Sequence, residues 1–277
     1  MPLRREDRRR GDCQRRRDTG DHRAPQPTRY DPGRVSPFFY AIGLSLIGSF
    51  GGLLVASALL LFPDGVRAKI VPWLVSYAVG TLLGVALLAL LPEALLVMPP
   101  GRVFESLLGG ILLFFVLEKL VLWRHCHTHD CEVHGGGAPL VLIGDAFHNF
   151  VDGAMIGAAV LTSVPLGIST AVAVATHEVP QEVGDFAVLL HAGYSRSSAL
   201  LLNVLSGVAA LVGAALAVLL VDAMPTLKPY LLCVAAASFL YVAMADLIPD
   251  LHSGRITGGA FRQLLLVAAG VMTAYFL

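Results

Sequence analysis

Eight long apolar segments run through most of this chain and constrain its fold more than any other feature. Each is about as long as the ~20 apolar residues of helix that cross a bilayer core. Lipid offers no hydrogen-bond partner to exposed backbone groups, so each crossing should be helical. The sequence therefore predicts an all-α integral membrane protein with eight transmembrane helices, at about 37–62, 70–97, 103–123, 138–164, 166–192, 198–221, 227–251 and 257–277.

The composition agrees with a chain embedded in lipid. Hydrophobic residues make up 56% of its 277 residues and charged residues only 14%, whereas soluble domains carry about 25% charged residues. The connections between segments are short, and stretches such as FPDGVRAK and HSGRITGG carry the glycine, proline and charge typical of turns. We expect the lipid bilayer, and no nucleic acid, among its partners.

The first 36 residues differ from the rest. They hold 11 of the 20 lysines and arginines, show no periodicity and contain few apolar residues, which predicts a disordered basic tail. They lack the short apolar stretch and small-residue cleavage site of a signal peptide. Our hypothesis is that residues 1–36 are a misassigned start, that translation begins near Val35, and that 37–277 is the working domain. Peptides from residues 4–30 in the native protein would contradict it.

Basic residues outside the tail predict the orientation. An even number of crossings puts both termini on one side, and cytoplasmic loops are enriched in lysine and arginine. We therefore expect the connections after segments 1, 3, 5 and 7 in the cytoplasm and both termini outside, although the tail's arginines point the other way. These four connections hold seven basic residues against two in the others: Arg67, Lys69, Lys119, Arg124, Arg196, Arg255 and Arg262 against Arg102 and Lys228.

A short echo between segments 2 and 7 suggests an internal repeat. Segment 2 contains Leu-Leu-Pro-Glu, ending at Glu93, and segment 7 contains Leu-Ile-Pro-Asp, ending at Asp250. The two are symmetry mates if segments 1–3 and 6–8 are repeats around a central pair. Three crossings per copy invert the second copy, and inverted repeats with a site near the midplane are a transporter design. The predicted arrangement is 3+2+3, and chance similarity of four residues is the alternative.

Ionisable residues gather in the central pair of segments. Segment 4 contains GDAFHNFVDG, where His148 and Asp152 share a helix face at i and i+4. Segment 5 contains HEVPQEVGD, where His177 lies beside a stripe of acids at helical spacing: Glu178, Glu182 and Asp185. Neither segment has a lysine or arginine, and unpaired anions at this depth cost several kcal/mol each.

Either these acids are protonated in a proton relay, or a cation compensates them. Histidine with carboxylate suits a borderline divalent metal, Zn²⁺ first by ligand type, so a metal site is our interpretation. Pro180 lacks the N–H that would bond the carbonyl of Thr176. We expect the opened turn to let a hydrated cavity reach the ligands, with an ordinary transmembrane kink as the alternative.

An enzyme is the second class of function to weigh. HEVPQ resembles the beginning of the zinc protease motif H-E-x-x-H, but Gln181 stands where the second zinc histidine would be. The chain also has no G-x-x-x-x-G-K phosphate loop. We therefore expect no enzyme, with an intramembrane zinc metalloprotease as the alternative.

The two motifs, HNFVDG and HEVPQEVGD, resemble the paired signatures of the ZIP family of zinc transporters, in its subgroup with H-N-F-x-D-G and H-E-x-P-x-E-x-G-D. The resemblance runs from about residue 37 to the end of the chain. It implies a binuclear site. One metal would use His148, Asp152, His177 and Glu182, and the second would use Asn149 and Glu178, with Asp152 and Glu182 as bridges.

The resemblance also implies a function and an assembly. We expect a homodimer in the plasma (inner) membrane that carries Zn²⁺, and Fe²⁺, Mn²⁺ or Cd²⁺ as further candidates, into the cytoplasm by alternating access. A passive metal channel with the same site is the alternative. Two bundles are implied, segments 1, 4, 5 and 6 against 2, 3, 7 and 8. Candidate pathway or accessory residues are Asp145, Gln181, Asp185 and Asp246.

One departure from the family concerns segment 6. Some bacterial members have a carboxylate there, but this chain has only Asn203 and Ser206. The second metal is therefore expected to be weakly held or structural.

The segment 124–137 is a further candidate for metal binding. It has enough ligands for one or two zinc ions, and its expected cytoplasmic position suggests capture or sensing of metal that has crossed. Incidental affinity in a solvated loop is the alternative. The candidate ligands are His125, Cys126, His127, His129, Cys131 and His134.

Overall fold

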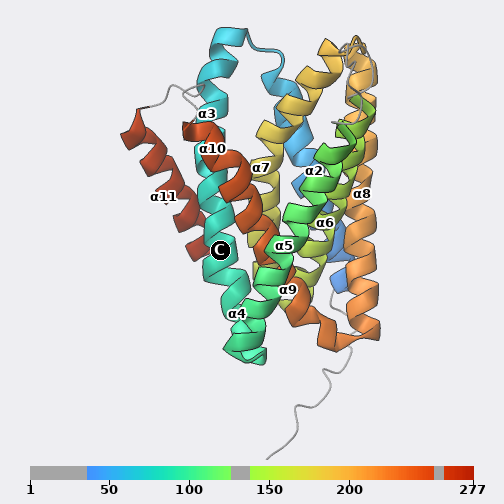
Figure 1. Ribbon diagram of the computed structural model, residues 1–277, viewed down its shortest axis with the longest axis vertical. Helices are drawn as coiled ribbons and strands as arrows, with labels where there is room; N and C mark the ends of the chain where they lie inside the picture. The colour runs from blue at the N-terminus through green and yellow to red at the C-terminus, as the bar shows by residue number, and fades with distance from the viewer. Residues whose placement is uncertain (1–35, 126–137, 253–258) are drawn as a thin grey trace, which may run out of the picture. The chain divides into compact units, whose positions relative to one another are not determined.

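Helices account for almost all the residues that the structure describes. The computed structural model describes residues 36–125, 138–252 and 259–277, and contains no strand in these ranges, so the predicted all-α class is confirmed. The predicted tail and the loop residues 126–137 lie outside the described part. In chain order the single helices are α2 (Pro37–Leu59), α5 (Pro100–His125), α6 (Ala138–Thr162), α7 (Val164–His191), α8 (Arg196–Ala223) and α11 (Ala260–Phe276) (Figure 1).

Two further helical stretches are composite, and each contains a π-helical turn. One runs through α3 (Asp64–Gly84), η1 (Val85–Leu90) and α4 (Leu91–Val97). The other runs through η2 (Pro225–Leu227), α9 (Lys228–Tyr241), η3 (Val242–Leu247) and α10 (Ile248–His252). Pro92 and Pro249 follow the π turns by two residues. Because proline crowds the carbonyl one turn before it, a widened π turn at that point accommodates the ring.

The described ranges thus hold eight continuous helical stretches, in the order expected from hydropathy. Their ends agree with the predicted ones to within three residues, except that the second begins at Asp64 rather than 70. Pro63 directly precedes this helix, and its first turn is polar. Hydropathy marks only the part of a helix that crosses the hydrocarbon core, so it cannot reveal a polar turn that extends the helix beyond it.

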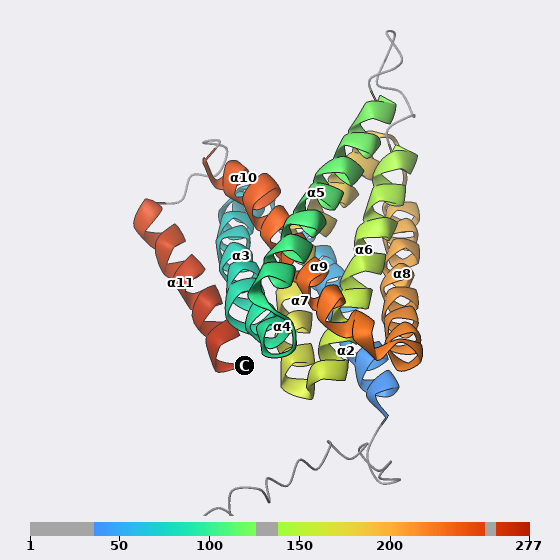
Figure 2. The same cartoon turned by 60° about the horizontal axis from the view of Figure 1, so that its bottom comes forward.

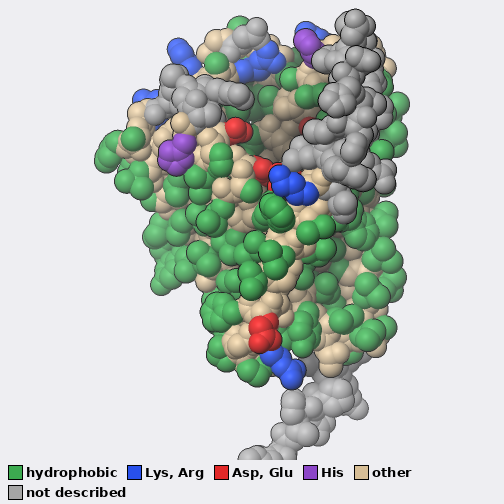
Figure 3. Space-filling view, viewed as in Figure 1, with side chains coloured by type: hydrophobic (Ala, Val, Ile, Leu, Met, Phe, Trp, Pro, Cys, Tyr) green, Lys and Arg blue, Asp and Glu red, His purple; other side chains and the backbone are tan. Residues whose placement is uncertain are grey.

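The helices have the length and surface expected in lipid. Five stretches are long and apolar enough to cross a membrane: α2, Gly65–Val97, Pro100–Lys119, α8 and Pro225–His252. α6 and α7, with 25 and 28 residues, are as long but carry the buried acids, and α11 has 17 residues. Figure 3 shows hydrophobic side chains across the middle of one face, with lysine and arginine concentrated in the upper part and at the lower end.

Packing divides the helices into two groups. In the first, α6 packs on α8 and α7, and α2 packs on α7 and α8; in the second, α3 packs on α11 and α5 on α9. Figures 1 and 2 both show α11 at one edge beside α3, and α8 at the opposite edge beside α6. The groups correspond to segments 1, 4, 5 and 6 and segments 2, 3, 7 and 8, the division that the family resemblance implied.

The backbones of α6 and α8 approach each other very closely. A Cβ added at Gly153 would lie 1.8 Å from the carbonyl oxygen of Ala210, and one at Gly213 would lie 1.9 Å from that of Phe150. Helices in lipid associate through close van der Waals contact and not through a hydrophobic driving force, so small residues mark their interfaces. This contact holds α6, which bears half of the candidate site, in register with α8.

Candidate metal centre

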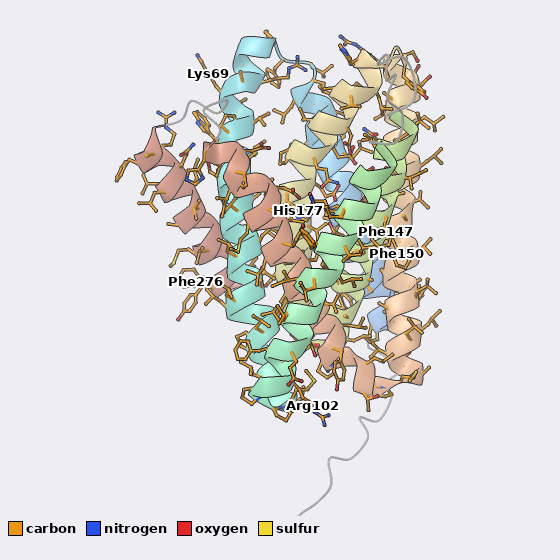
Figure 4. The ribbon with its side chains drawn as sticks, in the orientation of Figure 1. Lys69, Arg102, Phe147, Phe150, His177 and Phe276 are labelled. Atoms are coloured by element: carbon orange, nitrogen blue, oxygen red, sulfur yellow. The ribbon has the colours of Figure 1, made fainter. Side chains whose placement is uncertain are left out.

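Four ionisable side chains from α6 and α7 converge in the interior of the first helix group. One ligand atom from each of His148, Asp152, His177 and Glu178 lies within 4.8 Å of the others. The Nε2 atom of His177 is 3.1 Å from Nε2 of His148 and 3.0 Å from Oδ2 of Asp152. Figure 4 shows His177 near the middle of the bundle, between Lys69 toward one end and Arg102 toward the other.

The ring of His177 is oriented by its own helix. Its Nδ1 atom lies 2.9 Å from the carbonyl oxygen of Ala173, one turn earlier in α7. A carbonyl can only accept a hydrogen bond, so Nδ1 carries the proton and Nε2 keeps its lone pair toward the cluster. A hydrogen bond of this kind fixes the tautomer of most metal-binding histidines. Phe239 of α9 packs edge-on to the ring, with centroids 6.1 Å apart.

A second cluster adjoins the first and contains only oxygen ligands. Carboxylate oxygens of Asp145, Glu178 and Glu182 lie within 4.8 Å of one another. Glu178 belongs to both clusters, so the structure groups Glu178 and not Glu182 with the histidine pair. The reason is helical rise, because Glu182 lies one turn beyond Glu178, about 5–6 Å farther along α7.

Asp145 lies at the centre of a buried hydrogen-bond network from four helices. Its Oδ1 accepts from Nδ2 of Asn149 at 3.0 Å and from Nε2 of Gln181 at 3.4 Å. Its Oδ2 accepts a short hydrogen bond from Oγ of Ser206 in α8. Oγ of Ser49 in α2 donates to Oδ1 of Asn149 at 2.9 Å. Asn149 is thus engaged with Asp145 and Ser49. Sequence reasoning missed the parts of Ser49 and Ser206, because a serine in an apolar helix gives no signal by itself.

The acids of both clusters have no lysine or arginine partner among the described residues, and histidine is the one basic side chain beside them. Glu178 and Glu182 are 0% and 1% exposed, and no hydrogen-bond donor in the described part of the chain reaches their carboxylate oxygens. α6 and α7 contain no lysine or arginine. Buried charges are normally paired or bound to metal, since an unpaired one is strongly unfavourable. The site is therefore suited to cations. Two imidazoles with carboxylates suit Zn²⁺, and the oxygen-only set suits harder ions.

A cavity of about 400 Å³ connects the histidine pair with one end of the bundle. His148, His177 and Pro180 line its inner part, as the sequence predicted for a cavity beside that proline. Asp246 in η3 and Asp250 in α10 line its outer part, toward the end where α3 begins and α10 ends.

On the other side of the histidine pair, toward the end where α6 ends and α7 begins, both helices are packed into an apolar core. Ile156 of α6 and Val174 of α7 are at most 1% exposed there. In this structure the histidine pair is therefore connected by the cavity with one end of the bundle, and apolar packing lies between the pair and the other end.

The remaining predicted residues have different surroundings. Gln181 contacts Asp145 and lines the cavity. Asp185 lies one turn beyond Gln181 on α7, partly buried, and is grouped with neither cluster. The candidate loop ligands from Cys126 to His134 lie outside the described residues, and His125 ends α5.

Comparison with known proteins identifies the family. The profile described as "ZIP Zinc transporter" matches residues 124–277, more than half of the chain. Zinc transporter ZIP13 of Pongo abelii is 34% identical over 214 residues, which cover 72% of this chain and 64% of that protein. For human zinc transporter ZIP13 the identity is 31% over 253 residues, with coverage of 72% and 68%.

Human zinc transporter ZIP4 is 46% identical over 110 residues, which cover 40% of this chain and 17% of that protein. The chain thus spans less than two thirds of the length of some of these relatives, ZIP4 above all. The profile match covers more than half of this chain, and the similarity to human ZIP13 covers 68% of that protein. The chain therefore belongs to the ZIP family of zinc transporters.

Proposed function

We propose that this chain carries Zn²⁺ across a membrane into the cytoplasm through the two clusters on α6 and α7. The observation that carries the proposal is a set of two histidines and several buried carboxylates at mid-bundle, in two helices without any lysine or arginine. The names of the relatives, all zinc transporters, support zinc as the substrate. Fe²⁺, Mn²⁺ and Cd²⁺ are further candidate substrates, because the ligands mix nitrogen and oxygen.

The geometry supports a modified version of the binuclear site. We assign one ion to His148, Asp152, His177 and Glu178, and a second to Asp145, Glu178 and Glu182, with Glu178 as the shared ligand. In this assignment Asp145 of α6 supplies the carboxylate that the sixth transmembrane segment, α8, lacks.

Replacing Asp145 by asparagine tests the second ion. Asparagine keeps the size of the side chain but removes one anionic ligand, so we expect the purified protein to bind one Zn²⁺ instead of two. Affinity at the second position should fall at least about tenfold, the effect of losing even a supporting residue. Equilibrium dialysis with metal analysis measures both. Asp222→Asn, in the exposed last turn of α8, is the matched control and should bind two ions. Retention of both ions by the Asp145→Asn protein would refute the assignment.

Direction and alternating access are supported by charge and by the cavity. The connections that carry most of the loop lysines and arginines lie at the end toward which the cavity extends, and such loops face the cytoplasm. We propose that the structure is the state open to the cytoplasm, with ions leaving past Gln181, Asp246 and Asp250, and with Asp185 as an accessory acid.

Few polar contacts join the two helix groups near the site. Oγ1 of Thr81 in α3 and Oγ1 of Thr176 in α7 are 2.8 Å apart, and the ring of Phe239 meets His177. The remaining contact between the groups is mostly apolar, as where α3 packs on α7 and α9 on α6, and a contact with few hydrogen bonds is compatible with movement of one group against the other.

An inverted repeat is supported by the two π-helical turns. η1 and η3 occupy the same position relative to Pro92-Glu93 and Pro249-Asp250. We therefore keep the 3+2+3 arrangement, in which the second and seventh stretches are symmetry mates. Homodimer formation, location in the plasma membrane with both termini outside, and metal capture by the loop 124–137 are proposed from the family resemblance and the loop charges.

Uptake by proteoliposomes tests the function and separates its alternatives. A carrier should take up Zn²⁺ with saturation at a slow turnover, because each cycle needs a conformational change on the microsecond-to-second scale. Non-saturating flux near the diffusion limit would instead indicate a channel, and absence of zinc-dependent uptake would refute transport. The metalloprotease alternative is disfavoured, since the named relatives are transporters and Gln181 occupies the second histidine position.

A further inference from the structure

A groove of about 860 Å³ lies apart from the metal centre, at the end of the bundle where α2 and α7 end and where α3 and α8 begin. No residue of the two ligand clusters lines it. It faces outward between helices that carry exposed leucine and phenylalanine side chains, so its long side opens toward lipid. The proposed transport path does not use this groove, which leaves it as a candidate binding surface for another molecule.

The groove changes from apolar to basic along its length. One wall follows α2 from Leu54 to Phe62, a rise of about 12 Å at 1.5 Å per residue. Phe186 of α7 contributes to the opposite wall. The helix ends provide the polar part, where Arg67 and Arg196 both line the groove.

The basic end of the groove has features that favour an anion. Arg196 is the first residue of α8, and its neighbour Ser197 also lines the groove. Helix N-termini carry a partial positive charge. Arginine pairs bind phosphate through charge-assisted, bidentate hydrogen bonds.

We propose that this groove binds an anionic phospholipid, with its phosphate between Arg67 and Arg196 and an acyl chain along the wall from Leu54 to Phe186. The order of groups along the groove matches that of a lipid, since the charged part lies at the helix ends and the apolar part toward the middle of the bilayer. A free phosphate would leave the apolar wall without an occupant. A zwitterionic lipid offers the two arginines no net negative charge. Basic pockets between transmembrane helices bind anionic headgroups in this way.

Native mass spectrometry of the full chain with phosphatidylglycerol or phosphatidylcholine tests the proposal. We expect the wild-type protein to bind phosphatidylglycerol in preference to phosphatidylcholine. The Arg67→Gln/Arg196→Gln protein should bind phosphatidylglycerol at least about tenfold more weakly, since each basic residue contributes substantially to anionic lipid binding. The matched control is Lys69→Gln/Arg262→Gln, which removes the same charge outside the groove, near the starts of α3 and α11. It should keep the preference.

A second variant tests the apolar wall with both arginines intact. Ala58→Trp places a large ring in the groove, at an exposed position of α2, and should weaken phosphatidylglycerol binding. Inorganic phosphate should not compete with phosphatidylglycerol for the wild-type protein. Equal loss of binding in both arginine and control doubles would overturn the proposal, because it would indicate general surface charge. The proposal would also be overturned if the Ala58→Trp protein kept its affinity for phosphatidylglycerol. The same holds if a second copy of the chain occupied the groove in a dimer that this variant loses.

Discussion

Replacing Asp152 by alanine is expected to reduce Zn²⁺ uptake into proteoliposomes by at least about 100-fold, beyond the 10–100-fold loss typical of supporting residues. Oδ2 of Asp152 lies 3.0 Å from Nε2 of His177 and 3.6 Å from Nε2 of His148. Its removal takes a carboxylate from between the two histidines and leaves Glu178 as the one acid of this cluster. Uptake of radioactive or fluorescently detected zinc, normalised to folded protein, measures the effect.

The control for this substitution is a carboxylate outside the site. Asp222→Ala removes an exposed acid from the last turn of α8 and should leave uptake unchanged. A folded Asp152→Ala protein that transports zinc at the wild-type rate would exclude the histidine-containing cluster from the transport path. If zinc binding is lost together with uptake, the defect is in binding. If binding is kept and uptake is lost, the defect is in the conformational change.

The largest effect on stability is expected from one methyl group at Gly153. A Cβ there would lie 1.8 Å from the carbonyl oxygen of Ala210 and 2.7 Å from its Cα. Both obstacles are backbone atoms, so no rotamer change relieves the contact and α6 must move away from α8. Overpacking of this kind costs about 1–3 kcal/mol or more. We expect a lower thermal midpoint for Gly153→Ala in detergent, together with weaker zinc binding.

Gly144→Ala is the matched control on the same helix. A Cβ at Gly144 meets nothing within 4 Å, and alanine is favoured over glycine inside a helix by about 1 kcal/mol. The thermal midpoint should therefore stay the same or rise. If both alanine variants shifted the midpoint in the same direction, the close approach of α6 and α8 would not be what stabilises this interface.

Local composition was sufficient to predict the number, order and approximate ends of the helices. Hydropathy and turn residues are properties of short stretches, and each membrane helix satisfies its own backbone hydrogen bonds. Spacing at i and i+4 likewise placed His148 and Asp152 on one face of a helix. The absence of lysine and arginine from α6 and α7, read from the sequence alone, predicted either protonated acids or a compensating cation, and the two histidines favoured the cation.

The grouping of ligands depended on packing between helices. Spacing along α7 put Glu178 and Glu182 on one face, but it did not show which of them lies level with His148. Which glutamate lies level with His148 depends on how far α7 is shifted along α6 and on how α7 is rotated about its own axis. The sequence predicted Asp145 only as a pathway or accessory residue, for a related reason, since its grouping with Glu178 and Glu182 and its bond to Ser206 of α8 depend on helix packing.

The sequence by itself determined an all-helical membrane protein and predicted a cation site in its two central helices, because apolar length and the absence of basic residues are encoded locally. The tertiary structure alone decided that Glu178 belongs to both clusters, that Asp145 completes the second, and that Arg67 and Arg196 meet at one groove. These relations join residues far apart in the chain. They follow from how closely the helix backbones approach, as at Gly153, and no single segment specifies that distance.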